Sequence, residues 1–156
     1  MKNYCYYPAP FGDLLLVEEN EKIEHVMFPV EHNTRTLEKE WIEDKNAFKD
    51  IFTQFDEYFS GKRKVFSLKL NPIGTKFQKS VWQELQKIPY GETTNYGELA
   101  RRIGNPNASR AVGAANGKNP IVIIIPCHRV IGKDGSLTGF GGGLPVKEQL
   151  LALERP

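Results

Sequence analysis

Residues 71–74, which read Asn-Pro-Ile-Gly, break the chain of 156 residues into two parts with different hydrophobic patterns. Proline followed closely by glycine interrupts helices and strands, because proline lacks a backbone N–H and glycine favours turns. We therefore predict a domain boundary at this segment. An α/β domain is expected in residues 1–74 and a mainly helical domain in residues 75–156.

The first part has strand patterns followed by a helix pattern. Apolar residues recur every three or four positions in residues 48–59, which predicts an amphipathic helix that ends at Gly61. Residues 65–70 alternate and predict a further strand. Three earlier strands are predicted at residues 4–7, 13–17 and 22–28. A polar hairpin turn at residues 19–21 joins the last two.

The second part has helix patterns with clear start and stop signals. Thr75 with Gln78 has the spacing of a capping box, which opens a first helix. A similar signal at Asn95 opens a second helix, which ends at Gly104. Pro106, in the first helical position, is expected to begin a third. Two short helices around a single glycine are the outline of a helix–turn–helix.

The third predicted helix is rich in small residues, with Arg110 among them. Gly113 inside a helix costs about 1 kcal/mol relative to alanine, so some other interaction should offset it. Small side chains allow either tight packing against a neighbouring helix or close approach to a narrow DNA groove. The small residues of this helix are Ala108, Ser109, Ala111, Gly113, Ala114 and Ala115.

Charge is divided unevenly between the two parts. Residues 1–74 hold 10 Lys and Arg against 13 Asp and Glu, whereas residues 75–156 hold 11 against 6. The basic second part indicates either a polyanionic partner or a charge imbalance without function. We expect no membrane partner, because the longest apolar run, residues 121–126, is far shorter than the roughly 20 residues that cross a bilayer.

Residues 121–125 are all β-branched and predict a buried strand that leads to Cys127 and His128. A buried cysteine is most often a small core residue, so adjacency to histidine is a weak signal of catalysis by itself. Consecutive side chains of a strand face opposite sides, so the pair needs a bend or a bridging water to interact. Cys5 and Cys127 are both expected to be reduced, and no paired Cys or His spacing predicts a metal site.

Residues 126–130, Pro-Cys-His-Arg-Val, resemble the active-site signature of the O6-alkylguanine-DNA alkyltransferases. The resemblance covers essentially all of residues 75–156. It implies an α/β fold, with a small ribonuclease-H-like N-terminal domain followed by a winged helix–turn–helix catalytic domain. Further matching segments lie at residues 77–82, 88–93, 96–100, 105–106, 109–113, 119–120 and 144–148, and at Glu154.

The resemblance implies a reaction that needs no cofactor and no metal. Cys127 would accept the alkyl group irreversibly, once per protein chain. His128 would take the thiol proton through a water molecule, and Glu154 would orient His128 and balance its charge. Tyr96 would donate a proton to the departing base. The substrate implied is O6-alkylguanine in DNA, and O4-alkylthymine is a second candidate.

The family docks the third helix in the minor groove of double-stranded DNA, and this implies further roles. Arg110 resembles an arginine finger that fills the space left by a flipped nucleotide, and Asn119 resembles a hinge residue. The other positions implied to contact DNA are Ser109, Ala111, Gly113, Ala114 and Tyr96. The positions implied to line the substrate pocket are Val130, Phe140, Gly141 and Arg129.

Three other functions compete with this interpretation. A non-catalytic relative that only binds the lesion would lack Cys127, which is present. A winged-helix regulator would explain the basic second part but not the set of cysteine, histidine and glutamate. A cysteine hydrolase would have no use for Arg110. We expect a monomer in the cytoplasm, or in the nucleus of a eukaryote.

Overall fold

The first part of the chain forms a four-stranded sheet in the order β3-β2-β1-β4. The computed structural model describes residues 1–29, 38, 40–137, 140 and 142–155. Strands β1 (Asn3–Ala9), β2 (Gly12–Glu19) and β3 (Lys22–Met27) are antiparallel neighbours, and β4 (Ile42–Glu43) runs parallel to β1. Asn20 and Glu21 have φ of 53° and 65°, as a tight hairpin turn requires. The three predicted strands and their turn are confirmed.

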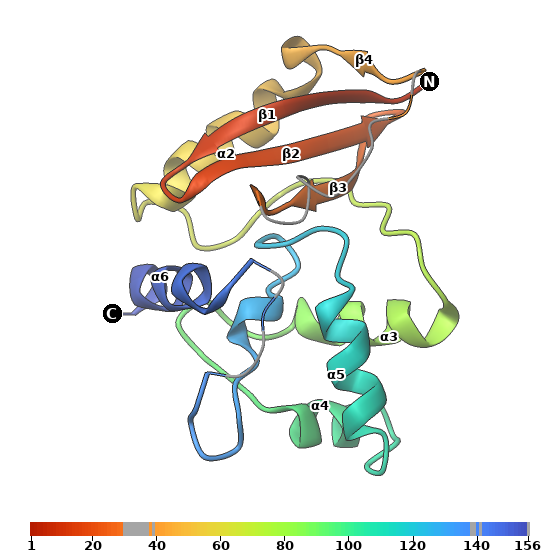
Figure 1. Cartoon of the computed structure of the whole chain (residues 1–156), viewed down its shortest axis with the longest axis vertical. Coiled ribbons are helices and arrows are strands. Elements are labelled where there is room, and N and C mark those ends of the chain that lie inside the picture. The colour runs from red at the N-terminus through yellow and green to blue at the C-terminus, as the bar shows by residue number, and fades with distance from the viewer. Residues whose placement is uncertain (30–37, 39, 138–139, 141, 156) are drawn as a thin grey trace.

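One face of the sheet is covered by α2 (Lys49–Phe59), which follows a short 3₁₀ turn, η1 (Lys45–Phe48) (Figure 1). The helix buries Ile51, Phe55 and Tyr58, which lie on one side of it at the predicted spacing. The strand predicted at residues 65–70 is wrong. This segment makes a single bridge, from Leu70 to Ile23, and the Gln54 side chain binds both backbone groups of Ser67, at 2.9 and 3.0 Å.

The second part contains four α-helices in its described residues: α3 (Lys76–Leu85), α4 (Tyr96–Arg102), α5 (Ser109–Gly117) and α6 (Leu144–Glu154). The capping box of Thr75 with Gln78 and the cap at Asn95 are both present, as predicted. The third helix does not begin at Pro106. A separate turn, in which Ala108 N donates to Asn105 O at 3.0 Å, comes first, so α5 begins at Ser109.

Residues 121–125 are buried as predicted, but they do not form a continuous strand. Ile121 bridges Val26 of β3, and the chain then turns back so that Val122 bridges Ile125. Ile123 lies in this turn with φ of 73°, a conformation that β-branched residues rarely adopt. The segment is held on the free edge of the sheet, where Val26 N donates to Pro120 O at 2.9 Å.

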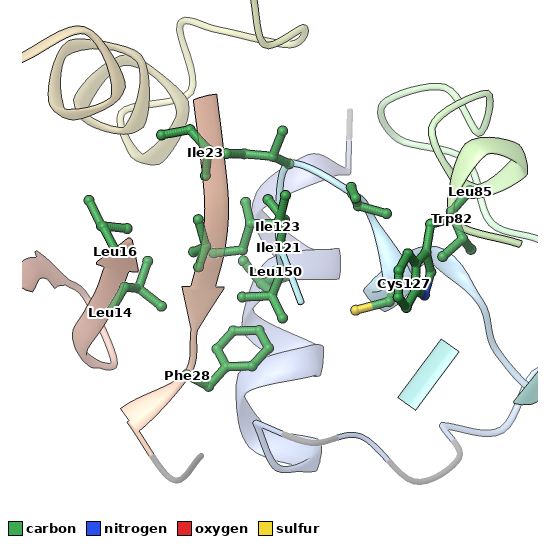
Figure 2. Close-up of a cluster of buried hydrophobic side chains, with 14 of the residues drawn as sticks. Leu14, Leu16, Ile23, Phe28, Trp82, Leu85, Ile121, Ile123, Cys127 and Leu150 are labelled. Atoms are coloured by element: carbon green, nitrogen blue, oxygen red, sulfur yellow. The ribbon is translucent and has the colours of Figure 1, made fainter. Parts of the chain in front are cut away.

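This docking joins the two parts of the chain through a shared hydrophobic core. Figure 2 shows side chains from the sheet, from residues 121–125 and from α6 in one cluster that extends to Cys127. The boundary at residue 74 stays a prediction. Within the described part of the chain, the structure contains no helix that is both long enough and apolar enough to span a membrane.

Replacing Ile121 by alanine should weaken the contact between the sheet and residues 121–125, the segment that leads to Cys127 and that we call the reactive segment. The side chain is fully buried, so Ile121→Ala is expected to lower the free energy of unfolding by roughly 2–5 kcal/mol. Val65→Ala is the matched control, because Val65 is 75% exposed and its truncation should change stability by less than about 0.5 kcal/mol. Urea unfolding measures both values. Similar small losses in the two variants would contradict the docking described here.

Candidate active site

Cys127 and His128 lie in a single turn of 3₁₀ helix, η2 (Cys127–Arg129). Pro126 precedes the turn, and Cys127 N donates to Ile125 O at 2.8 Å. This turn supplies the bend that an extended strand would lack, so the two side chains are not held on opposite faces. Cys127 is only 4% exposed, and a substrate must therefore be brought into the protein to reach its sulfur.

His128 binds Glu154, the last residue of α6, inside the protein. The distance between His128 Nε2 and Glu154 Oε2 is 2.7 Å, and the two side chains are 0% and 2% exposed. Burial lowers the pKa of His128, although the carboxylate of Glu154 acts in the opposite direction. A neutral imidazole that donates from Nε2 to a carboxylate has an unprotonated Nδ1. Nδ1 is buried and has no hydrogen-bond partner in the described structure, so it is the atom that can accept a proton.

Glu154 also binds Arg129, which lies beside His128 in the turn. Arg129 Nε donates to Oε1 at 2.7 Å, and its terminal nitrogens donate to Oε2 at 3.1 Å and to Ile88 O at 2.7 Å. Burial by itself would raise the pKa of Glu154, but hydrogen bonds from His128 and Arg129 outweigh it and lower the pKa to about 2. Arg129, expected in the substrate pocket, is thus engaged by Glu154 and the Ile88 carbonyl.

Lys147 is a residue of the site to which the sequence analysis gave no role. It is fully buried, its Nζ donates to Val130 O at 2.6 Å, and it lies 5.6 Å from the centre of the Phe140 ring. Burial lowers the pKa of Lys147, and the electrostatic interaction with Cys127 acts in the opposite direction. Lys147 shares the buried side of α6 with Leu150, Leu151 and Glu154, and this spacing is a signal that could have been found in the sequence.

Phe28, at the end of β3, reaches the loop that precedes α6. Its ring lies 5.1 Å from that of Phe140. A Cβ atom added to Gly142 would come within 2.7 Å of the Phe28 ring, so only glycine fits there without a shift. Sequence reasoning missed this contact because it joins residues more than a hundred positions apart. Gly141, which was predicted to line the pocket, lies outside the described residues.

Two asparagines attach the end of α5 to the reactive segment. Asn119 donates to Ile125 O at 2.7 Å and accepts from Ile121 N at 3.0 Å, so it spans the turn of residues 121–125. Asn116 donates to Cys127 O at 3.4 Å. Asn119 was expected to join the helix–turn–helix to the reactive segment, and its bonds are compatible with that role. Asn116 was not expected.

The outer side of α5 exposes Arg110, Ala111 and Ala114, while Ser109 and Gly113 are half-buried. A Cβ at Gly113 would lie 3.8 Å from the ring of Tyr96, which is ordinary contact. Packing within the protein therefore does not require glycine at this position. The small residues instead leave an outer surface with little side-chain bulk and one long cation, Arg110. No group of three His, Cys, Asp or Glu side chains in the described parts could hold a metal ion.

Comparisons with known proteins agree with this geometry. The 6-O-methylguanine DNA methyltransferase ribonuclease-like domain matches residues 2–72, and the DNA-binding domain of the same family matches residues 76–156. The methylated-DNA–protein-cysteine methyltransferase of Methanosarcina acetivorans is 50% identical, over 97% of each chain. That of Haemophilus influenzae is 49% identical, over 97% of this chain and 86% of its own.

Solved structures of methyltransferases are also similar to this chain. Mycobacterium tuberculosis O6-methylguanine methyltransferase is 44% identical, with a TM-score of 0.90 over 99% of this chain and 93% of its own. Mycobacterium tuberculosis OGT in complex with DNA has the same identity, with a TM-score of 0.91 over 98% of this chain and 92% of its own. The expected fold class is confirmed. The chain belongs to the 6-O-methylguanine DNA methyltransferase family.

Proposed function

We propose that the protein repairs DNA by moving an alkyl group from O6 of guanine to Sγ of Cys127, once per chain. One observation carries the proposal: the buried bond of 2.7 Å between Glu154 and His128, the residue that follows Cys127 in η2. A free thiol is only a few per cent thiolate at neutral pH, so it needs a base to become nucleophilic. Burial lowers the pKa of His128 and so favours the neutral imidazole that can act as this base.

The first step moves the thiol proton of Cys127 through a water molecule to Nδ1 of His128. Nε2 keeps its own proton and its bond to Glu154, so the carboxylate stabilises the imidazolium that forms. The charge on Glu154 must be present beforehand, and its low pKa of about 2 supports this requirement. Glu154 therefore orients His128 and balances its charge without accepting the proton.

The second step transfers the alkyl group. The thiolate attacks the alkyl carbon in line, a carbon–sulfur bond forms, the bond from carbon to O6 breaks, and its electron pair stays on guanine. Tyr96 supplies a proton, so that neutral guanine leaves. The product on Cys127 is a thioether, which water does not hydrolyse readily, so the protein is consumed stoichiometrically. O4-alkylthymine presents the same kind of carbon–oxygen bond and is a second candidate substrate.

Double-stranded DNA is the proposed partner, bound by a monomer with α5 in the minor groove. The exposed small residues of α5 support close approach, and Arg110 extends from the same surface. The nucleotide must rotate out of the duplex, because Cys127 is 4% exposed and cannot reach a stacked base. Arg110 would fill the space left behind. Lys147 fixes the Val130 carbonyl, which would accept a bond from the flipped base.

Two competing functions fit the structure less well. A protein that only binds the lesion has no need for the buried set of Cys127, His128 and Glu154. A transcription regulator with a winged helix would use the outer surface of α5, but it gives no reason for an ionised carboxylate in the protein interior, where an uncompensated charge is costly.

Mixing the protein with an oligonucleotide that contains O6-methylguanine should add one methyl group to each chain. Intact-mass spectrometry is expected to show a single addition, which peptide mapping places on Cys127. Cys127→Ser should abolish transfer while DNA affinity stays nearly unchanged, because the residue is buried. Unmodified protein after long exposure, or many repairs per chain, would refute the proposal.

Arg110→Ala should slow repair of duplex DNA far more than reaction with the free alkylated base. Extruding a nucleotide costs a few kcal/mol, and losing the group that fills its place should slow duplex repair by about tenfold or more. Single-turnover rates with the two substrates measure the difference. Equal losses on both would show that Arg110 does not act in extrusion.

Ala114→Leu should weaken DNA binding without affecting the fold, because Ala114 is exposed on the outer side of α5. A bulky side chain would hold the helix away from the groove, and an affinity loss of about tenfold corresponds to 1.4 kcal/mol. Ala152→Leu is the matched control, since Ala152 is an exposed alanine on α6. Fluorescence anisotropy with duplex DNA should separate them, and unchanged affinity in Ala114→Leu would argue against this docking surface.

A further inference from the structure

We propose that Tyr58, from α2 in the first part of the chain, is a positioning residue of the alkyl-transfer relay. Its hydroxyl donates to the same oxygen of Glu154 that His128 uses, and so it limits how strongly Glu154 supports His128 as a base. The inference rests on the proposed function and extends it to the N-terminal part, to which the sequence analysis gave no chemical role.

Tyr58 is fixed in place by its surroundings. Its hydroxyl lies 2.5 Å from Glu154 Oε2, and the ring is fully buried. Phe59 packs edge-on against the ring at 5.1 Å, and Phe66 lies 5.3 Å away. Burial raises the pKa of Tyr58 above its usual value, and the charge of Glu154 acts in the same direction, so the hydroxyl keeps its proton and remains a donor.

The two oxygens of Glu154 are used unequally. Oε1 accepts from Arg129 Nε at 2.7 Å. Oε2 accepts from Tyr58 at 2.5 Å, from His128 at 2.7 Å and from a terminal nitrogen of Arg129 at 3.1 Å. A carboxylate oxygen has two lone pairs, so three donors at Oε2 compete for its electron density. The hydrogen bond from Tyr58 therefore weakens the hydrogen bond that Oε2 accepts from His128.

The competition between Tyr58 and His128 for Oε2 should lower the pKa of His128. Without the Tyr58 hydroxyl, Oε2 would attract the His128 N–H more strongly, and the imidazolium would be more stable. The pKa of His128 should then rise. The other charged groups around the pair are Arg129 in η2 and Lys147 in α6, and both lower the pKa of His128. Tyr90, in the segment after α3, also lies near Glu154 and Arg129. The variant Tyr58→Phe keeps all of these residues and removes only the hydroxyl.

If Tyr58 had a purely structural role, removing its hydroxyl would have a different effect. In that case the hydroxyl would only fasten α2 to α6. Its removal would lower the stability of the fold and reduce the reaction rate by the same factor at every pH. The pH dependence of His128 thus separates the two roles.

The test compares Tyr58→Phe with Tyr7→Phe in the full chain. Tyr7 is the matched control, because its buried ring also belongs to the first part and its hydroxyl donates to Asp56 of α2 at 2.6 Å, away from Glu154. Two quantities are measured against pH: the NMR signals of the histidine rings and the single-turnover rate of methyl transfer from duplex DNA. The chain has only three histidines, so their signals can be assigned.

Tyr58→Phe should move the His128 titration and the acidic limb of the rate profile to higher pH, each by about half a pH unit or more. Tyr7→Phe should move neither curve. Unchanged curves in Tyr58→Phe, or equal shifts in both variants, overturn the proposal. Shifted histidine signals in a protein that transfers no methyl group would support the role of Tyr58 while refuting the proposed function, so the two failures can be distinguished.

A second variant covers the case in which Tyr58→Phe does not fold. Tyr58→3-fluorotyrosine keeps the shape of the side chain and makes the hydroxyl a stronger donor. Both curves should then move to lower pH, opposite to the effect of phenylalanine. A shift to higher pH, or no shift, would refute the proposal.

Discussion

The buried charge of Glu154 is the interaction on which the rest of the structure depends. A carboxylate that is 2% exposed is stable only if hydrogen-bond donors replace the water it has lost. Here three side chains supply the donors: Tyr58 in α2, and His128 and Arg129 in η2, the reactive turn. The same bonds that stabilise the charge therefore fasten the reactive turn to α6 and to the first part of the protein.

The hydrophobic contacts reinforce this arrangement. The segment of residues 121–125 completes the free edge of the sheet at β3 and delivers Cys127 to the protein interior. Phe28, at the end of the same strand, packs against Phe140 and leaves room only for glycine at position 142. The N-terminal part is thus more than an attachment to the catalytic part. It supplies Phe28, which packs against Phe140 before α6, and, through Tyr58, one of the hydrogen bonds of Glu154.

The protein separates its two proposed tasks in space. The reactive groups lie in the interior, where the low dielectric makes each charge and hydrogen bond more effective. The surface of α5 carries small side chains and Arg110, and its end is tied to the reactive segment by Asn116 and Asn119. The end of α5 is therefore joined by direct hydrogen bonds to the backbone of Cys127 and of Ile125.

The sequence by itself determined the local structure and the reactive residue types. The hairpin at Asn20 and the caps at Thr75 and Asn95 depend on residues only a few positions apart, so their patterns could be read directly. The segment with Cys127, together with Glu154, indicated the family. Only the tertiary structure decided that residues 65–70 are not a strand, because Gln54 binds the backbone groups of Ser67. It also decided that residues 121–125 turn back on themselves, because Val122 N donates to Val26 O of β3 while Ile125 N donates to Ile121 O within the turn.

The contacts of Tyr58, Phe28 and Lys147 were decided in the same way. Tyr58 and Glu154 are 96 positions apart, and no periodicity connects them. Hydrophobic patterning shows which side of a helix is buried, but it does not show what that side will meet. A buried charge and its donors come together only when the chain packs. For this reason the sequence identified Cys127, His128 and Glu154, whereas only the fold showed that Tyr58 and Lys147 lie around them.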